Sequence, residues 1–221
     1  MMFKDGDTIV FAGDSITDAD KNTTWDGIGN GYVRLVRDAL AAFFPQIRCR
    51  VFNAGVSGDN SRDLLARWEK DVDSREPSVV FCLIGANDIW RHFDYLDPEK
   101  PLVSEEEYER NLTCICQKAQ RYDRFILITP YFMERNLSDE MRLFSERYAA
   151  IMRRVALKFG VPVLDAQKEF DAYMEYRSGM SISWDRVHPG AIGSMLLARM
   201  ILKASESGDR FSPKNFNESG K

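Results

Sequence analysis

The chain has 221 residues, which is enough for one well-buried domain and short for two. Its net charge of −4, with Lys and Arg interleaved among Asp and Glu, argues against a nucleic-acid-binding protein, which usually carries a basic stripe. No apolar run approaches the roughly 20 residues needed to span a bilayer, so we expect neither a membrane nor a nucleic acid as partner.

Five short apolar runs are predicted to be strands. They lie at residues 8–12, 51–52, 79–84, 125–128 and 161–164. Their apolar character is continuous rather than alternating, which indicates strands that are buried on both faces. Pro162 cannot donate a hydrogen bond to a neighbouring strand, so we expect the last run at an edge of the sheet.

Amphipathic segments between these runs are predicted to be helices. Ser104 and Glu107 form a capping-box signature before one of them. The last helix is expected to start near Pro189 and to end near Lys203. The residues that keep a helical spacing are Val33, Val36, Leu40 and Phe43; Leu64, Leu65, Trp68 and Val72; Tyr108, Leu112, Ile115 and Ala119; and Met141, Phe144, Tyr148, Ile151 and Val155.

The alternation of strands and helices predicts an α/β fold, a three-layer α/β/α sandwich around a five-stranded parallel sheet. Residues 1–204 are expected to form a single domain, followed by a polar tail over residues 205–221. In such sheets ligands bind beyond the carboxyl ends of the strands. The residues that follow each predicted strand are therefore the candidates for a functional site.

The cysteines indicate a reducing environment. Cys49, Cys82, Cys114 and Cys116 form no CxxC pair and no disulfide-like pattern. The last two are two positions apart on a predicted helix and would point to different faces, so we expect no metal site there. The segment Met1–Asp7 lacks the basic-then-apolar pattern of a signal peptide. We therefore expect a cytoplasmic protein.

Four polar motifs stand where this architecture would place a ligand. Three of them follow strands: Gly13-Asp14-Ser15, the loop Asn53–Asn60, and Gly85-Ala86-Asn87-Asp88; the fourth, Trp184–Pro189, opens the last helix. A serine after a strand can present its hydroxyl, loop glycines can expose a backbone N–H, and an Asn amide can donate to a developing negative oxygen. Each motif alone is explained as well by a turn or a helix cap.

Only two histidines could activate a serine. Asp185 and His188 are three positions apart, so a carboxylate could contact an imidazole and stabilise its charged form. His92 follows Trp90 and Arg91 in a predicted loop and has no comparable arrangement, although Asp94 is close in sequence. A general base would therefore be His188 or His92, and the pairing favours His188.

The four motifs in this order resemble the sequence blocks of the SGNH (GDSL-type) hydrolases, and the resemblance extends from about Gly6 to Leu202. It implies a flavodoxin-like sheet and a serine esterase that needs no cofactor. By the same resemblance Ser15 would be the nucleophile, His188 the general base and Asp185 the residue that orients the base. The implied oxyanion hole comprises the backbone N–H groups of Ser15 and Gly58 and the side chain of Asn87.

Aromatic residues in predicted loops suggest a binding surface for a sugar or an acyl chain, although several could equally be core or subunit-contact residues. They are Trp25, Trp90, His92, Phe93, Tyr131 and Trp184. Of these we select Trp90, Tyr131 and Trp184, together with Asp14 of the nucleophile motif, as candidate substrate-binding residues. Residues 91–104 are expected to influence substrate and subunit specificity.

A closer resemblance narrows the expected substrate. The runs at 29–33, 61–68, 87–91 and 184–189 are similar to those of bacterial cytoplasmic acetylxylan esterases, which implies deacetylation of short xylo-oligosaccharides and a homo-oligomer. Two alternatives stay open. One is another ester hydrolase of the same superfamily, acting on lysophospholipids, thioesters or aryl esters, and the other is a carbohydrate-binding protein without turnover.

Overall fold

The sheet has the predicted number of strands, and all of them are parallel. The computed structural model describes residues 2–94 and 101–206. The strand order is β2-β1-β3-β4-β5, which is the flavodoxin-like order. The strands are β1 (Thr8–Gly13), β2 (Arg50–Gly55), β3 (Val79–Leu83), β4 (Arg124–Ile128) and β5 (Val163–Leu164). The expected edge position of the last strand is confirmed.

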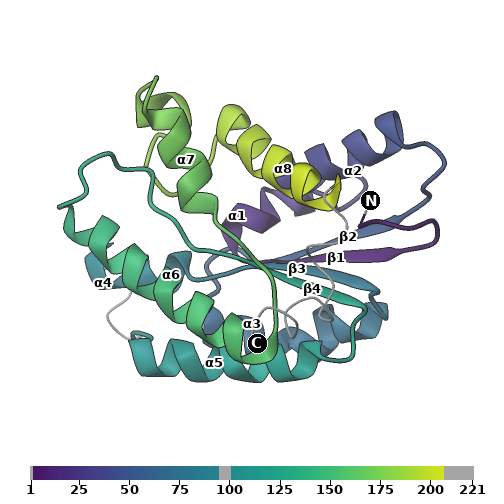
Figure 1. Cartoon of the computed structure of the whole chain (residues 1–221), viewed down its shortest axis with the longest axis horizontal. Helices are drawn as coiled ribbons and strands as arrows, with labels where there is room; N and C mark the ends of the chain where they lie inside the picture. The colour runs from purple at the N-terminus through teal and green to yellow at the C-terminus, as the bar shows by residue number, and fades with distance from the viewer. Residues whose placement is uncertain (1, 95–100, 207–221) are drawn as a thin grey trace, which may run out of the picture.

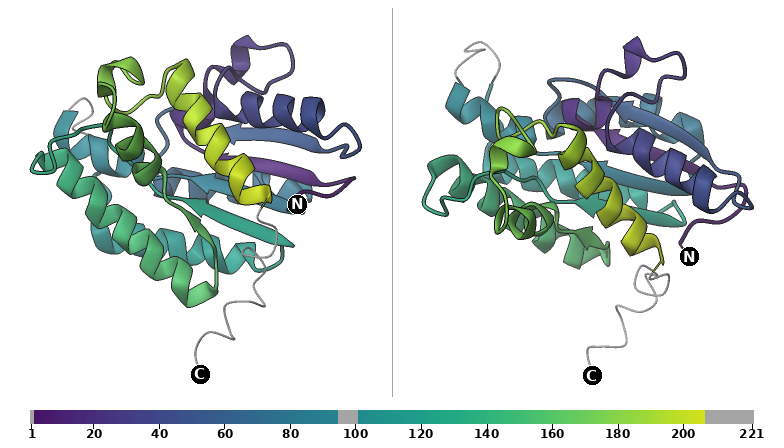
Figure 2. Two further views of the ribbon diagram at one scale, coloured as in Figure 1. Left: turned by 45° about the horizontal axis from the view of Figure 1, so that its top comes forward. Right: turned by 90° about the horizontal axis from the view of Figure 1, so that it is seen from above.

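Helices cover both faces of this sheet (Figure 1), and the separation into three layers is also visible in the turned views of Figure 2. On one face lie α2 (Tyr32–Phe43), α7 (Ala166–Met174) and α8 (Ala191–Glu206), with the short α1 (Ser15–Asp18) at its border. On the other lie α3 (Ser61–Asp71), α4 (Ala86–Asp94), α5 (Glu105–Ala119) and α6 (Glu140–Phe159). Three short 3₁₀ segments complete the described structure: η1 (Lys21–Thr23), η2 (Asp73–Arg75) and η3 (Gly179–Ser181). The predicted α/β/α sandwich is thereby confirmed.

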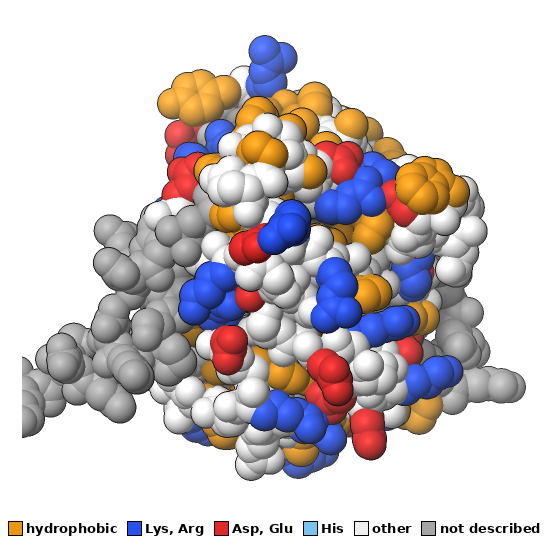
Figure 3. Space-filling model, turned by 90° about the vertical axis from the view of Figure 1, so that its right-hand side faces the viewer, with side chains coloured by type: hydrophobic (Ala, Val, Ile, Leu, Met, Phe, Trp, Pro, Cys, Tyr) orange, Lys and Arg blue, Asp and Glu red, His pale blue; other side chains and the backbone are white. Residues whose placement is uncertain are grey.

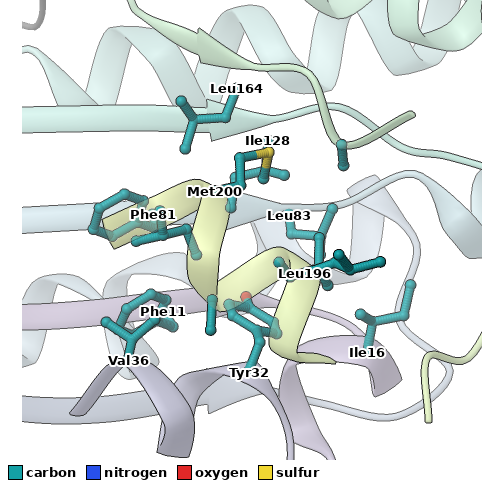
Figure 4. Packing of buried hydrophobic residues seen from close by; sticks show 14 of the residues in the cluster. Phe11, Ile16, Tyr32, Val36, Phe81, Leu83, Ile128, Leu164, Leu196 and Met200 are labelled. Atoms are coloured by element: carbon teal, nitrogen blue, oxygen red, sulfur yellow. The ribbon is translucent and has the colours of Figure 1, made fainter. Parts of the chain in front are cut away.

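Alternate residues of each central strand pack into separate cores on the two faces. Phe11 and Phe81 stack with their ring centroids 5.1 Å apart beneath α2 and α8 (Figure 4). Val10 and Val80 face α3, α5 and α6 instead. Side chains buried on both faces explain why these strands read as unbroken apolar runs in the sequence.

Several helical predictions need correction. Phe43 is the last residue of α2 and is 73% exposed, so it does not continue the buried face formed by Val33, Val36 and Leu40. The Ser104 hydroxyl accepts a hydrogen bond from the Glu107 amide as expected of an N-cap. The Glu107 carboxylate, however, pairs with Arg62 rather than completing a capping box.

The segment after β3 also differs from the expected loop. Residues Ala86–Asp94 form α4, so Trp90 and His92 stand on a helix. The last helix, α8, ends at Glu206, beyond the predicted Lys203, and the carbonyl of Ser205 accepts a hydrogen bond of 2.6 Å from the Met2 amide. Most of the predicted tail, residues 207–221, lies outside the described residues, and so does the middle of the predicted specificity segment, residues 95–100.

Charged side chains of both signs are interspersed over the face shown in Figure 3, in keeping with the interleaved sequence. Among the described residues, no helix combines the length and apolarity required of a membrane span.

The register of the sheet determines where the functional motifs meet. Gly13 at the end of β1 is paired with Gly55 of β2 on one side and with Leu83 of β3 on the other. The segments that carry Ser15, Gly58 and Asn87 therefore follow three adjacent strands, and all three begin at the carboxyl ends of those strands. A side chain at Gly13 could not be accommodated, because its Cβ would lie 2.4 Å from the carbonyl oxygen of Leu83.

Candidate active site

The first motif forms a sharp turn from β1 into α1. Asp14 caps the helix, since its Oδ1 accepts a hydrogen bond of 3.0 Å from the Ile16 amide. Ser15 is the first residue of α1 and remains partly exposed, whereas Asp14 and Ile16 are buried on either side of it. Burial of these two neighbours thus fixes the backbone of the turn, and the Ser15 hydroxyl stays accessible from outside.

The structure brings Ser15, His188 and Asp185 into one chain of hydrogen bonds. Ser15 Oγ lies 2.8 Å from His188 Nε2, and His188 Nδ1 lies 2.6 Å from Asp185 Oδ2. This is the order of contacts in a Ser-His-Asp triad, in which the acid fixes the imidazole tautomer and the imidazole can take the hydroxyl proton.

Asp185 is held in its ionised form. Burial alone would raise the pKa of its carboxyl, but hydrogen bonds from His188, Val187 and Ser183 lower the pKa below its ordinary value. Arg186 adopts a φ of 68°, which is unusual for a residue with a side chain. Because the backbone is left-handed at Arg186, the chain reverses after Asp185. The amides of Val187 and His188 then donate to Asp185 Oδ1 at 2.9 and 2.8 Å.

Two of the predicted oxyanion donors are backbone amides. Gly58 has a φ of +87°, a conformation that favours glycine, and the site of its missing Cβ faces open space. Within the part of the chain that the structure describes, neither the Ser15 nor the Gly58 amide donates to another residue. Both N–H groups are thus available to a ligand.

The third predicted donor, Asn87, is oriented by its neighbours. Its Nδ2 donates to the carbonyl oxygen of Asp59 at 2.9 Å, and its Oδ1 accepts from Arg91 at 3.1 Å. A side-chain amide nitrogen carries two hydrogens, so one remains for a ligand. The neighbouring Asp88 is buried and accepts from the Ser61 amide and hydroxyl, which ties the start of α4 to the start of α3.

A cavity of about 530 Å³ opens beside Ser15 and His188. Polar and apolar residues both line its wall, and Trp184, 78% exposed, stands at its rim. The other lining residues include Asp18, Asp20, Asn30, Ser57 and Ser194. Ser57 belongs to the motif after β2 and Asn30 to the run at residues 29–33, although neither is predicted from the sequence to line the site. For Asp18 and Asp20 the available signal is their closeness to Ser15 in the chain, and Ser194 has none.

The remaining candidate substrate residues divide into two groups. The Trp90 ring lies 5.5 Å from the His188 ring, close to the triad. Asp14 and Tyr131 are instead buried, at 0% and 3% exposure, and Tyr131 packs against Phe170. Their side chains therefore lie behind the cavity wall, where a ligand in the cavity would not touch them.

The other aromatic candidates are not brought to the cavity. The ring of His92 lies 4.8 Å from that of Phe144, and its Nε2 is 3.1 Å from the Val103 carbonyl oxygen, so it is engaged away from Ser15. Phe93 also packs on Phe144, and Trp25 projects into solvent with 96% exposure. Among the described residues, no cluster of three or more His, Cys, Asp or Glu side chains could hold a metal ion.

Comparison with known proteins finds a match to the GDSL-like Lipase/Acylhydrolase family over residues 11–196. The chain is 34% identical over 209 residues to the acetylxylan esterase of Geobacillus stearothermophilus, covering 92% of this chain and 95% of that protein. It is 25% identical over 183 residues to the thioesterase 1/protease 1/lysophospholipase L1 of Escherichia coli, covering 80% and 79% of the two chains.

Solved structures agree with these matches. LAE5, an alpha/beta hydrolase enzyme from the metagenome of Lake Arreo, superimposes with a TM-score of 0.89 at 39% identity, covering 95% of this chain and 99% of LAE5. Axe2, the Geobacillus acetylxylan esterase, superimposes with a TM-score of 0.88, covering 93% and 96%. Three solved variants of Axe2, each described as a catalytic mutant, replace one serine, one histidine and one aspartate.

Proposed function

The chain belongs to the GDSL-like lipase/acylhydrolase family and is a carboxylic ester hydrolase; we propose that its substrates are acetylated sugars. It would remove acetyl groups from short xylo-oligosaccharides or related sugars. The observation that carries the proposal is the hydrogen-bonded series Ser15–His188–Asp185 beside a cavity that polar and apolar residues line. The resemblance to an acetylxylan esterase over nearly the whole chain supplies the class of substrate.

In the proposed mechanism Ser15 Oγ attacks the acetyl carbonyl while His188 Nε2 takes the hydroxyl proton. Asp185 stabilises the imidazolium that forms. The amides of Ser15 and Gly58 and the side chain of Asn87 donate to the oxyanion, and one such donor is typically worth about 2.7–4 kcal/mol of transition-state stabilisation. His188 then protonates the departing ester oxygen, so that the sugar leaves with a free hydroxyl. In the second step His188 takes a proton from water, which attacks the acetyl-enzyme, and returns that proton to Ser15 Oγ as acetate leaves.

The polar side chains of the cavity wall favour a sugar ester over a long-chain acyl ester. A xylose unit presents hydroxyl groups that carboxylates and amides can bind, and Asp20 and Asn30 offer such groups. The exposed face of Trp184 at the rim could stack on a sugar ring. A long acyl chain would instead need a continuous apolar groove next to Ser15, whereas polar residues such as Asp20, Asn30 and Ser57 share this wall with the apolar ones.

The test is hydrolysis of acetylated xylo-oligosaccharides beside aryl esters with acetyl, butyryl and octanoyl groups. We expect release of acetate from the sugar and a kcat/KM for aryl esters that falls as the acyl chain grows. Preference for the octanoyl ester would remove the acetyl-sugar proposal and favour the lipid-acting relatives. The same assays on Ser15→Ala check that the measured turnover belongs to this site.

We further propose that the enzyme acts in the cytoplasm as a homo-oligomer. The four cysteines are free thiols, which is typical of a reducing compartment. An apolar groove of about 710 Å³ runs between α2 and α8 beside the exposed Phe43 and Met195, and such a patch is typical of a subunit contact. Cell fractionation tests the location, and light scattering of the wild type against Phe43→Lys tests the assembly.

A further inference from the structure

Arg67 makes more hydrogen bonds than an ordinary surface ion pair does, and it makes them at the carboxyl ends of the strands, beside the proposed active site. It lies on α3, and its side chain is only 15% exposed. Its Nη2 donates to the carbonyl oxygen of Gly13 at 2.8 Å, and its Nη1 donates to the carbonyl oxygen of Ala54 at 2.7 Å. Its Nε donates to Asp59 Oδ2 at 2.5 Å, and Nη1 also reaches Asp71 Oδ2 at 3.1 Å. One guanidinium thus joins the ends of β1 and β2 to the loop after β2.

Each proposed oxyanion donor lies next to one of these contacts. The Ser15 amide is two residues beyond Gly13 in the sharp turn. The Gly58 amide is one residue before Asp59. Asn87 Nδ2 donates to the backbone carbonyl of the same Asp59, at 2.9 Å. A displacement of Gly13 would therefore shift the Ser15 amide, and a displacement of Asp59 would shift Gly58 and Asn87, so either one would change the spacing of the three donors.

The loop that carries Gly58 is held on its other side as well. The Val56 amide donates to the carbonyl oxygen of Gly13 at 3.1 Å, so that oxygen accepts from both Val56 and Arg67. The Ser57 amide donates to Asp18 Oδ2 at 3.2 Å. Without Arg67, Asp59 would lose its side-chain link to the strand ends, while the backbone attachment through Val56 and the attachment through Asp18 would remain.

We propose that Arg67 is a positioning residue for the ester hydrolysis, which holds the three oxyanion donors at a fixed mutual spacing. The inference rests on the proposed roles of Ser15, Gly58 and Asn87. Arg67 itself touches no reacting atom. Its contribution should therefore appear in the transition state, where the oxyanion forms, and hardly in the binding of the ground-state ester.

Lysine should not replace this arginine. The planar guanidinium has five donors in a fixed fork and directs them at acceptors in different directions, whereas a lysine ammonium is a compact charge on a flexible stem. Arg67→Lys can keep an ion pair with Asp59 or Asp71 but cannot reach both strand-end carbonyls at once. Arg67→Lys would thus retain the positive charge but lose the simultaneous hydrogen bonds to the carbonyls of Gly13 and Ala54.

Arg124 offers a matched control at the opposite end of the sheet. It begins β4, is 10% exposed, donates to Asp7 Oδ1 at 2.8 Å, and also donates to the carbonyl oxygen of Met2. Replacing Arg124 leaves a buried carboxylate and a backbone carbonyl without this donor, as replacing Arg67 does. Here, however, the loss is at the amino ends of the strands. Arg124→Met should lower stability without affecting the geometry around Ser15.

The experiment compares Arg67→Lys, Arg67→Met and Arg124→Met with the wild type. The end point of fluorophosphonate labelling counts competent sites, and kcat and KM for nitrophenyl acetate are then expressed per labelled site. We expect Arg67→Met to lower kcat about 100-fold, which is the loss typical of one misplaced oxyanion donor, with KM close to the wild-type value. The rate of labelling should fall in parallel, and Arg67→Lys should recover little of either rate.

The outcomes separate this inference from the proposed function. Unchanged kcat and labelling rate per competent site in both Arg67 variants would overturn the positioning role and reduce Arg67 to a structural residue like Arg124. If Arg67→Met yields no folded protein, Arg67→Lys decides by the same two rates. Failure of the wild type on acetylated sugars would refute only the substrate proposal, whereas labelling retained in Ser15→Ala would refute the proposed nucleophile and this inference with it.

Discussion

The carboxyl of Asp14, directly before the proposed nucleophile, should make the stability of the protein depend on pH. Asp14 is 0% exposed. Its Oδ1 accepts from the Ile16 amide, while its buried Oδ2 has no hydrogen-bond partner in the part of the chain that the structure describes. Burial raises the pKa of this carboxyl from 3.8 to about 7, against the opposing effect of the Ile16 amide, and the nearby carboxylates of Asp88 and Asp59 raise it further.

The sign of the effect follows from proton uptake. Between pH 3.8 and about 7 the folded protein keeps a proton on Asp14 that the unfolded chain has released. The contribution of this group to the free energy of unfolding is therefore complete below pH 3.8 and is lost as the pH rises through about 7. The difference between the two pKa values corresponds to at most about 4 kcal/mol.

Asp14→Asn removes the titration but keeps an acceptor for the Ile16 amide, since Asn caps a helix about as well as Asp. Between about pH 5 and about pH 8, the unfolding free energy of the wild type should fall further than that of Asp14→Asn. We expect the two falls to differ by about 2 kcal/mol or more. Urea unfolding of both proteins at the two pH values measures it. Burial raises the pKa of Asp88 to about 7 as well, but Asp88 is present in both proteins and its contribution largely cancels.

The exposed Asp20 provides the control, because Asp20→Asn removes a carboxylate from the same region without removing a buried one. Its unfolding free energy should follow that of the wild type at both pH values. If Asp14→Asn also keeps a constant difference from the wild type at the two pH values, the carboxyl of Asp14 does not carry a buried proton in the folded protein.

Three further predictions concern the proposed triad. Ser15→Ala should abolish fluorophosphonate labelling and ester turnover, and robust labelling of this variant would sink the assignment of the nucleophile. His188→Ala should lower kcat by about 10³-fold or more, whereas His92→Ala should leave kcat nearly unchanged because its ring is engaged with Phe144 and Val103; steady-state kinetics showing an equal collapse would require a different base. Asp185→Asn should lower kcat by about 10²–10⁴-fold with little change in KM, and a pure KM effect would contradict its orienting role.

Most of the fold could be predicted from the sequence because the core is divided between two faces of one sheet. The central strands are buried on both sides, so each one appears as an unbroken apolar run. The helix α4 was missed for a physical reason. Its first turn contains Asn87 and Asp88, which are common turn residues, and here both are committed to side-chain hydrogen bonds with Asp59 and Ser61.

The site was less predictable because sequence spacing does not give distance or burial. The pairing of Asp185 with His188 could be anticipated, since three positions separate them. The contact of His188 with Ser15 depends on the order of the strands and needed the family resemblance. Burial of Asp14 and Tyr131 was not foreseen, because a polar residue after a strand can equally face the cavity or the core.

The hydrogen bond between Ser15 and His188 joins residues that are 173 positions apart in the chain. Closing so long a loop is entropically costly, so this contact should form only when the sheet and α8 have assembled. A ribosome-bound chain would then lack esterase activity until the segment around His188 has been synthesised and has docked. During refolding, recovery of turnover should accordingly lag behind the burial of Trp68, which lies in the core on the other face of the sheet.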